Sequence, residues 1–242
     1  MRYIFAFAFL MLFILKGYAQ YPFEKFPAIK YDSAEIINHG KTYNHGFYIT
    51  RSKGFKRIAS YKNYKLVFLS DSDILKDGTN ALLYHKNHII KRMCFDNTWL
   101  EQHVYIADID GNGLPDFKII VDNDGNGFAA DYETKVYLFN EGNDVFKLIV
   151  FTDLFSNIER DFNHDGNYEI IGQEYRRYKE HAYFIFNLYN FKNGKFVNVS
   201  HNYNYPIAIK YLYGRNFITA NNMPRGIMKK FTFKKPGDNF DN

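Results

Sequence analysis

The 242-residue chain contains one cysteine, Cys94, so it cannot form a disulfide within itself. Proline is scarce, at six residues, and no apolar run reaches the ~20 residues that a membrane-spanning helix needs. Charges of one sign never gather into a block, which argues against a nucleic-acid partner and against a basic membrane-binding patch. Stability is therefore expected from an apolar core, from bound metal or from both.

The first nineteen residues have the layout of a secretory signal peptide. A positive charge at Arg2 precedes an apolar run over residues 3–15, and the small residues Gly17 and Ala19 stand where a signal peptidase reads. Cleavage before Gln20 lowers the formal net charge from +5 to +3. No cysteine follows the cleavage point to carry a bacterial lipid anchor. We expect residues 1–19 to be removed and the product to be periplasmic or secreted, without stable membrane insertion.

The remaining residues, 20–242, have the texture of a single all-β domain. Tyr and Phe together number 46, and β-branched residues alternate with polar ones in short segments separated by Gly, Asn and Asp. No long segment has the 3.6-residue period of a helix. The strands that this pattern predicts are 47–50, 64–69, 81–85, 89–93, 103–107, 117–121, 134–139, 146–151, 169–174, 182–190, 195–199 and 207–213.

An internal repeat appears around two acidic loops, which we call the first loop (108–116) and the second loop (161–169). The loops start 53 residues apart, and each is followed by a strand, a gap and an aromatic strand containing Tyr137 or Tyr189. A period near 50 residues with several strands in each unit is typical of propeller blades. The units are clearest in 103–200. The sequence therefore predicts a small or irregular β-propeller-like array of about four blades, with a two-sheet sandwich carrying acidic turns as the alternative.

Both loops have the composition of a calcium site. Calcium takes about six to eight oxygen ligands at roughly 2.3–2.6 Å, which a compact loop supplies from alternate positions. Positions one, three, five, seven and nine hold Asp108, Asp110, Asn112, Leu114 and Asp116 in the first loop, and Asp161, Asn163, Asp165, Asn167 and Glu169 in the second. Position seven contributes its backbone carbonyl, and glycine at position six permits the sharp bend. An EF-hand would need an acid at position twelve, where Ile119 and Gly172 stand instead.

A third stretch is a poorer candidate. Asp122, Asp124 and Asn126 have the same spacing, but position nine is Ala130 and the closing acid comes one residue late, at Asp131. A glycine-rich turn is therefore favoured over a third calcium site. The first and second loops lie in different repeat units, so we expect each to bind its own ion independently of the other.

Residues 107–117 and 161–171 resemble the FG-GAP and VCBS calcium repeats of integrin-type β-propellers and of many exported bacterial proteins. The resemblance implies Ca²⁺ as the bound ion. It further implies a role as an adhesive propeller, an enzyme accessory module or a periplasmic inhibitor or immunity protein. Residues 121–139 in particular look like a small periplasmic group thought to inhibit lysozyme-type hydrolases.

These observations favour a binding protein over an enzyme. The sequence pairs no nucleophile with a base and contains no transition-metal cluster. Our first hypothesis is an exported calcium-binding protein whose partner is another protein or a cell-wall component, in its most specific form an inhibitor of a peptidoglycan hydrolase. The alternatives are a secreted carbohydrate-binding or adhesion module that stacks sugars on exposed Tyr and Trp99, and a glycosidase with two carboxylates from distant strands.

Overall fold

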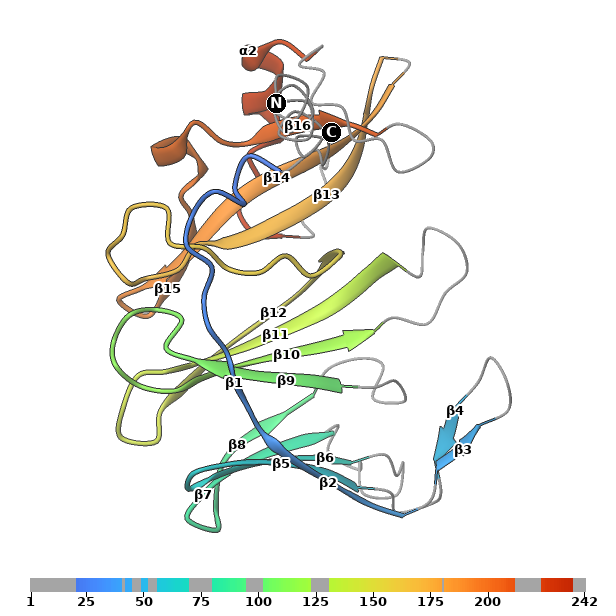
Figure 1. The fold of residues 1–242 in the computed structure, drawn as a ribbon, viewed down its shortest axis with the longest axis vertical. Coiled ribbons are helices and arrows are strands. Elements are labelled where there is room, and N and C mark those ends of the chain that lie inside the picture. The colour runs from blue at the N-terminus through green and yellow to red at the C-terminus, as the bar shows by residue number, and fades with distance from the viewer. Residues whose placement is uncertain are drawn as a thin grey trace, which may run out of the picture.

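The computed structural model in Figure 1 describes residues 21–40, 42–44, 49–51, 56–69, 80–94, 102–122, 131–179, 181–211 and 223–236. Several sequence predictions fall outside the described residues, namely the signal peptide (1–19), Trp99 and the part of the third stretch that contains Asp124 and Asn126.

The described residues are mostly strand and form three larger antiparallel sheets and a small hairpin, which confirms the all-β prediction. The first sheet has the order β2 (Glu35–His39), β5 (Lys56–Tyr61), β6 (Tyr64–Leu69), β7 (Ala81–His85) and β8 (His88–Met93). The second sheet has the order β1 (Asp32–Ser33), β9 (Gln102–Ala107), β10 (Asp116–Asp122), β11 (Tyr132–Asn140) and β12 (Phe146–Leu154). The third sheet consists of β13 (Ile170–Tyr178), β14 (His181–Lys192), β15 (Lys195–Asn198) and β16 (Ile207–Lys210).

The remaining elements are short. They are the hairpin of β3 (Thr42–Asn44) and β4 (Ile49–Arg51), the single-turn helix α2 (Arg225–Met228), and the 3-10 turns η2 (Ser200–Tyr203) and η3 (Lys229–Phe231). Among the residues that the structure describes, no helix has both the length and the apolar character needed to span a membrane.

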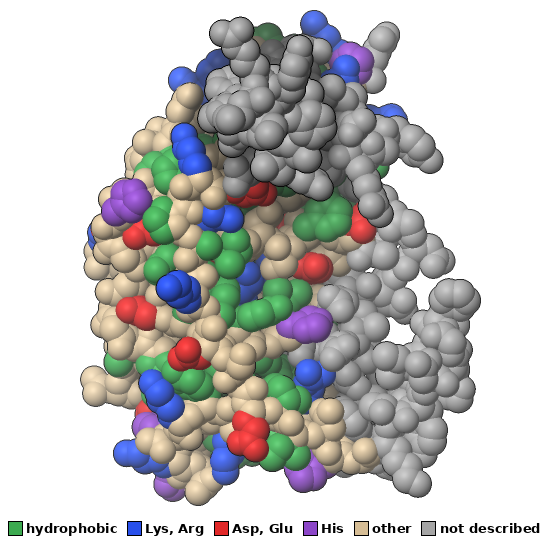
Figure 2. Space-filling model, viewed as in Figure 1, with side chains coloured by type: hydrophobic (Ala, Val, Ile, Leu, Met, Phe, Trp, Pro, Cys, Tyr) green, Lys and Arg blue, Asp and Glu red, His purple; other side chains and the backbone are tan. Residues whose placement is uncertain are grey.

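The three large sheets are stacked along the long axis of the molecule (Figure 1). In the first two sheets, four consecutive strands pair neighbour to neighbour, and a strand from the N-terminal segment extends one edge. None of the three closes on itself, and a ring of about four blades is not seen in the described part of the chain. On the face drawn in Figure 2, acidic, basic and apolar side chains are interspersed and do not gather by sign.

Alternation along the strands gives each sheet inward-facing apolar rows, and these rows form the cores between sheets. The first and second sheets share one core, to which Leu66, Leu83, Phe117 and Leu138 contribute buried side chains. The second and third sheets share another, in which the rings of Phe139 and Phe191 stack 4.0 Å apart at 4°. That stack joins β11 of one predicted repeat unit to β14 of the next.

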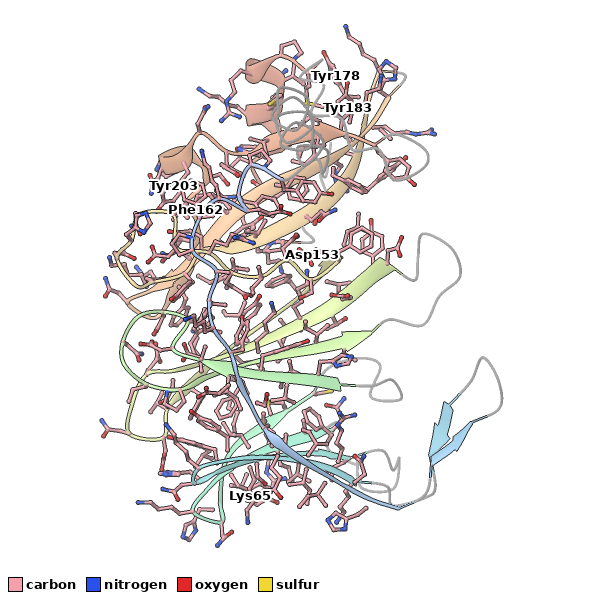
Figure 3. All side chains as sticks on the ribbon, in the orientation of Figure 1. Lys65, Asp153, Phe162, Tyr178, Tyr183 and Tyr203 are labelled. Carbon is pink, nitrogen blue, oxygen red and sulfur yellow. The ribbon has the colours of Figure 1, made fainter. Side chains whose placement is uncertain are left out.

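Buried ion pairs also lie between the second and third sheets. Lys118 Nζ lies 2.7 Å from Glu159 Oε1, and both side chains are almost fully buried. Lys135 pairs with Asp153 in the same way. Asp153, labelled in Figure 3, belongs to β12 and also accepts from Gln173 N of β13 at 3.0 Å. Burial opposes the ionisation of Glu159, but Lys118 and the hydroxyls of Tyr31 and Tyr137 lower the pKa of this carboxyl overall. The buried Glu159 carboxylate is therefore stabilised by a charged partner and two hydroxyl donors.

Residues 21–33, which we call the strap, run as a blue line over the stacked sheets in Figure 1 before β2 begins. Ile29 N donates to Glu159 O at 3.0 Å, and Asp161 N donates to Pro27 O at 3.0 Å. Phe26 stacks on Phe162 with ring centroids 4.2 Å apart. The strap therefore holds in place the segment that leads into the second loop. It then ends as β1, at the edge of the second sheet.

Candidate metal centre

The two acidic loops adopt the same backbone course. The first loop connects β9 to β10, and the second loop leads into β13. Position six has a positive φ in both, 84° at Gly113 and 83° at Gly166, as the glycine there predicts. Position four is also left-handed, at Gly111 with φ 74° and at His164 with φ 61°, which the sequence analysis did not anticipate.

The acids at positions one and nine close each loop in the same manner. Asp108 Oδ2 accepts from Gly113 N at 2.8 Å, and Asp161 Oδ2 accepts from Gly166 N at 3.0 Å. The position-nine acid accepts from the amide of position two. Asp116 Oδ2 does so from Ile109 N at 2.8 Å, and Glu169 Oε2 does so from Phe162 N at 3.0 Å. Asp116 and Glu169 are both 0% exposed, so these bonds form inside the protein.

Positions three and five pair an acid with an amide in each loop. In the first loop Asn112 Nδ2 donates to Asp110 Oδ2 at 3.2 Å, and in the second Asn163 Nδ2 donates to Asp165 Oδ2 at 3.0 Å. The two residue types have exchanged places, but each loop keeps three carboxylates and the same internal contact.

Each loop is also anchored to a neighbouring strand. Asn112 Nδ2 donates to Asn140 O at 2.7 Å in the first, and Asn167 Nδ2 donates to Phe191 O at 2.9 Å in the second. Leu114, the position-seven residue of the first loop, is half-buried and its N–H donates to Asn112 Oδ1 at 2.8 Å.

The outer oxygen of the position-nine acid has a different partner in each loop. Asp116 Oδ1 accepts from Asn140 N at 2.8 Å, which ties the first loop to β11. Glu169 Oε1 accepts from the hydroxyl of Tyr203 at 2.7 Å, which ties the second loop to η2. Figure 3 shows Tyr203 beside Phe162 at this place, and their rings lie 5.2 Å apart. No sequence signal pointed to Tyr203, which lies 34 residues beyond Glu169.

The carboxylates converge in the first loop. Asp108, Asp110 and Asp116 each offer an oxygen, and these three atoms lie within 4.8 Å of one another. The three acids of the second loop are also described, and they do not form such a group. The structure therefore brings together positions one, three and nine of the first loop, while Asp161, Asp165 and Glu169 lie further apart.

Electrostatics favour a cation at these acids. Burial, together with the nearby charge of Asp110, raises the pKa of Asp116 to about 8 despite the hydrogen bonds that it accepts from backbone amides. Burial likewise raises the pKa of Asp110, where Asp108 contributes as a like charge. In the second loop burial raises the pKa of Glu169 despite its bonds from Phe162 and Tyr203. A bound cation would stabilise all three carboxylates in their charged form.

Two buried oxygens support the same reading. Asp108 Oδ1 and Asn167 Oδ1 are shielded from solvent and have no hydrogen-bond partner in the described structure. An unsatisfied buried polar atom costs about 1–3 kcal/mol, more when it is charged. The offered ligands are all oxygen, which suits calcium better than zinc. The residues of the first loop therefore fit a calcium ion.

The third stretch offers less evidence for a metal site. Asp122 is the last residue of β10 and pairs with Glu133 on β11, while Asp124 and Asn126 lie outside the described residues. Comparison with known proteins adds no assignment, because no family model, curated protein or solved structure matches the chain.

Proposed function

We propose that this chain is an exported calcium-binding protein of the FG-GAP/VCBS repeat type. Its three sheets act as the blades of an open, propeller-like array, and the array binds another protein or a cell-wall component. The observation that carries the proposal is the convergence of Asp108, Asp110 and Asp116, where Asp108 also has a buried oxygen without a hydrogen-bond partner in the described structure. The second loop supports it by repeating the same backbone course and the same bonds.

The metal has a structural role in this proposal. A bound calcium ion supplies two positive charges to a set of carboxylates that otherwise repel one another. Asp116 connects the first loop to β11 through Asn140, and Glu169 connects the second loop to η2 through Tyr203. The chain's own contribution is to hold these oxygens in place and exclude water from them. The loops thus fix the ends of strands that belong to different sheets.

Calorimetric titration of metal-free protein with calcium tests the proposal. We expect two ions per chain and a higher melting temperature in calcium than in chelator. Magnesium should bind more weakly, because it demands a smaller octahedral shell and retains its waters. A titration without heat, together with equal melting curves in calcium and chelator, would remove the metal from the proposed function.

The partner is addressed by a second experiment. The chain should retain a periplasmic protein in calcium and lose it in chelator, and the inhibitor hypothesis requires the retained protein to be a peptidoglycan hydrolase. Inhibition of purified lysozyme-type hydrolases, measured by clearing of cell-wall suspensions, is its direct readout. Retention of cell-wall polysaccharide without any protein would favour the carbohydrate-binding alternative. Turnover of that polysaccharide would favour the glycosidase.

A further inference from the structure

The first and second loops are in direct contact, although they belong to different repeat units. Tyr168 N donates to Ile109 O at 2.9 Å, which joins position eight of the second loop to position two of the first. Ile109 is 1% exposed and packs in the same core as Ile170, at the start of β13. The contact is therefore part of the packed interior between the second and third sheets.

Gly111 makes the closest approach. A Cβ on this residue would lie 2.9 Å from Gly166 O, closer than real Cβ atoms come, and 3.1 Å from Asn167 N, which is tighter than most Cβ contacts. The left-handed backbone alone does not require glycine, because His164 occupies the equivalent position of the second loop with φ 61°. Glycine at 111 is thus needed by the contact between the loops.

The contact involves candidate ligand residues of both loops. Asn167, whose backbone lies against Gly111, is 6% exposed. Its Oδ1 is one of the two buried oxygens in these loops that have no hydrogen-bond partner in the described structure. The other such oxygen is Oδ1 of Asp108. The Asp108 side chain is fixed by a hydrogen bond from Gly113 N, two residues beyond Gly111. Candidate ligands of both loops therefore lie only a few backbone bonds from the contact. A change in how rigidly one loop is held can thus affect the ligands of the other.

We propose that the two loops form a single two-calcium centre whose ions bind cooperatively. This inference rests on the proposed function and replaces the independent sites expected from the sequence. Occupation of the first loop, where three carboxylates already converge, fixes the backbone from Ile109 to Gly113. Binding of an ion to the second loop then loses less conformational entropy, because Gly166, Asn167 and Tyr168 already lie against a rigid neighbour.

Electrostatics act in the opposite direction. Each loop carries three carboxylates, so a bound ion leaves its loop less negative and less attractive to a second cation nearby. Salt weakens this effect over a Debye length of about 8 Å at physiological ionic strength. The packed contact is short-ranged and does not depend on salt. At physiological ionic strength we therefore expect net positive cooperativity, which grows as salt is added.

Calorimetry on two ligand variants measures the coupling. In the parent protein the second ion should bind at least about fivefold more tightly than the first, the lower end of ordinary coupling between sites. Asp108→Ala should weaken the ion left in the second loop by the same factor. Glu169→Gln should weaken the ion left in the first loop equally, because linkage is reciprocal.

A matched pair of glycine variants locates the coupling. Gly111→Ala and Gly113→Ala both place a side chain at a positive φ in the first loop, but a Cβ on Gly113 meets nothing within 4 Å. Gly111→Ala should bring the coupling factor close to one. Gly113→Ala should weaken the first site by backbone strain and keep the coupling factor within about twofold of the parent.

The outcomes separate this inference from the proposed function. Absence of calcium binding by the parent protein would overturn both. Two ions with independent affinities, unchanged in either ligand variant, would overturn cooperativity alone. Equal coupling in Gly111→Ala and the parent would overturn the role of the contact. If circular dichroism shows that Gly111→Ala does not fold, the two ligand variants still decide whether the sites are coupled.

Discussion

The first and second loops follow the same backbone course, yet only the first brings three carboxylates within 4.8 Å of one another. They differ at positions three and five, where acid and amide have exchanged places, and at the closing residue. Asp116 is short and is fixed by backbone amides of its own loop and of β11. Glu169 is one methylene longer and directs an oxygen to Tyr203. The comparison teaches that two loops with the same backbone course can differ in how closely their carboxylates converge, since the acid at position three of the first loop stands at position five in the second.

The comparison extends to what surrounds each loop. The first loop is held mainly by β9, β10 and the end of β11, all within the second sheet, and it also contacts the second loop through Ile109 O. The second loop is flanked by the strap at Pro27 and by the first loop at Ile109. The surroundings of the second loop thus come from parts of the chain that are far away in sequence. The affinity of this loop for calcium should therefore depend on those parts.

The largest expected effect comes from removing calcium from both loops. At about 100-fold excess over Kd, each site that binds only the folded state contributes about 2.7 kcal/mol to the free energy of unfolding. For a domain of this size the melting temperature should fall by roughly 10–20 °C when both ions are chelated. Differential scanning calorimetry in calcium and in chelator measures the change. Identical melting curves would contradict it.

The closing acids give the next effect, and they distinguish the loops. In chelator, Asp116→Asn should lower the free energy of unfolding more than Glu169→Gln. Asp116 accepts bonds from three backbone amides, whereas Glu169 accepts from Phe162 N and Tyr203. An amide side chain leaves some of these donors unsatisfied, at about 1–3 kcal/mol for each. Urea denaturation of both variants provides the comparison, and an equal loss would show that the loops close alike.

A smaller effect is expected from Tyr203→Phe, which removes the hydroxyl that only the second loop uses. A hydrogen bond to a charged group contributes about 1.5–3 kcal/mol when buried, and less here because Tyr203 is partly exposed. Tyr205→Phe is the matched control, since the buried hydroxyl of Tyr205 has no partner in the described structure. Denaturation should show a loss for the first variant and little change for the second. The reverse order would argue against the bond to Glu169.

The smallest expected effect is none at all. Asp122→Ala should leave the calcium stoichiometry unchanged, because Asp122 belongs to β10 and its stretch lacks the acid at position nine. Asp108→Ala, the same substitution at position one of the first loop, should lose one ion. Calorimetric titration counts the ions in both variants. A lost ion in Asp122→Ala would establish a third site that the spacing argument rejects.

Much of this fold is predictable from local pattern. The predicted strands 64–69 and 81–85 coincide with β6 and β7, because alternation and turn residues bound them clearly. β1, β2, β3 and β5 were not predicted. All five residues of β2 are exposed, so this edge strand lacks the buried alternating face on which the pattern depends. The prediction for 207–213 is confirmed from Ile207 to Lys210, and its last two residues, Leu212 and Tyr213, lie outside the described residues.

The candidate site divides in the same way. Positions one, three and nine of the first loop were predicted and do converge, because their placement depends on a short stretch of chain. The contact of Gly111 with Gly166 and the bond from Tyr203 to Glu169 were not predicted. Both join residues that are brought together by the packing of sheets, and spacing along the sequence carries no information about them.

The strap sets an order of events in folding. Arg160 Nη1 donates to the carbonyl oxygens of Glu24 and Phe26, partners more than 130 residues earlier in the chain. Contacts of such long range are slow to form, because a large loop must close before any stabilisation is gained. During synthesis the strap emerges well before Arg160 and the second loop exist. We therefore expect the part of this protein that is made early to be among the last to reach its final position.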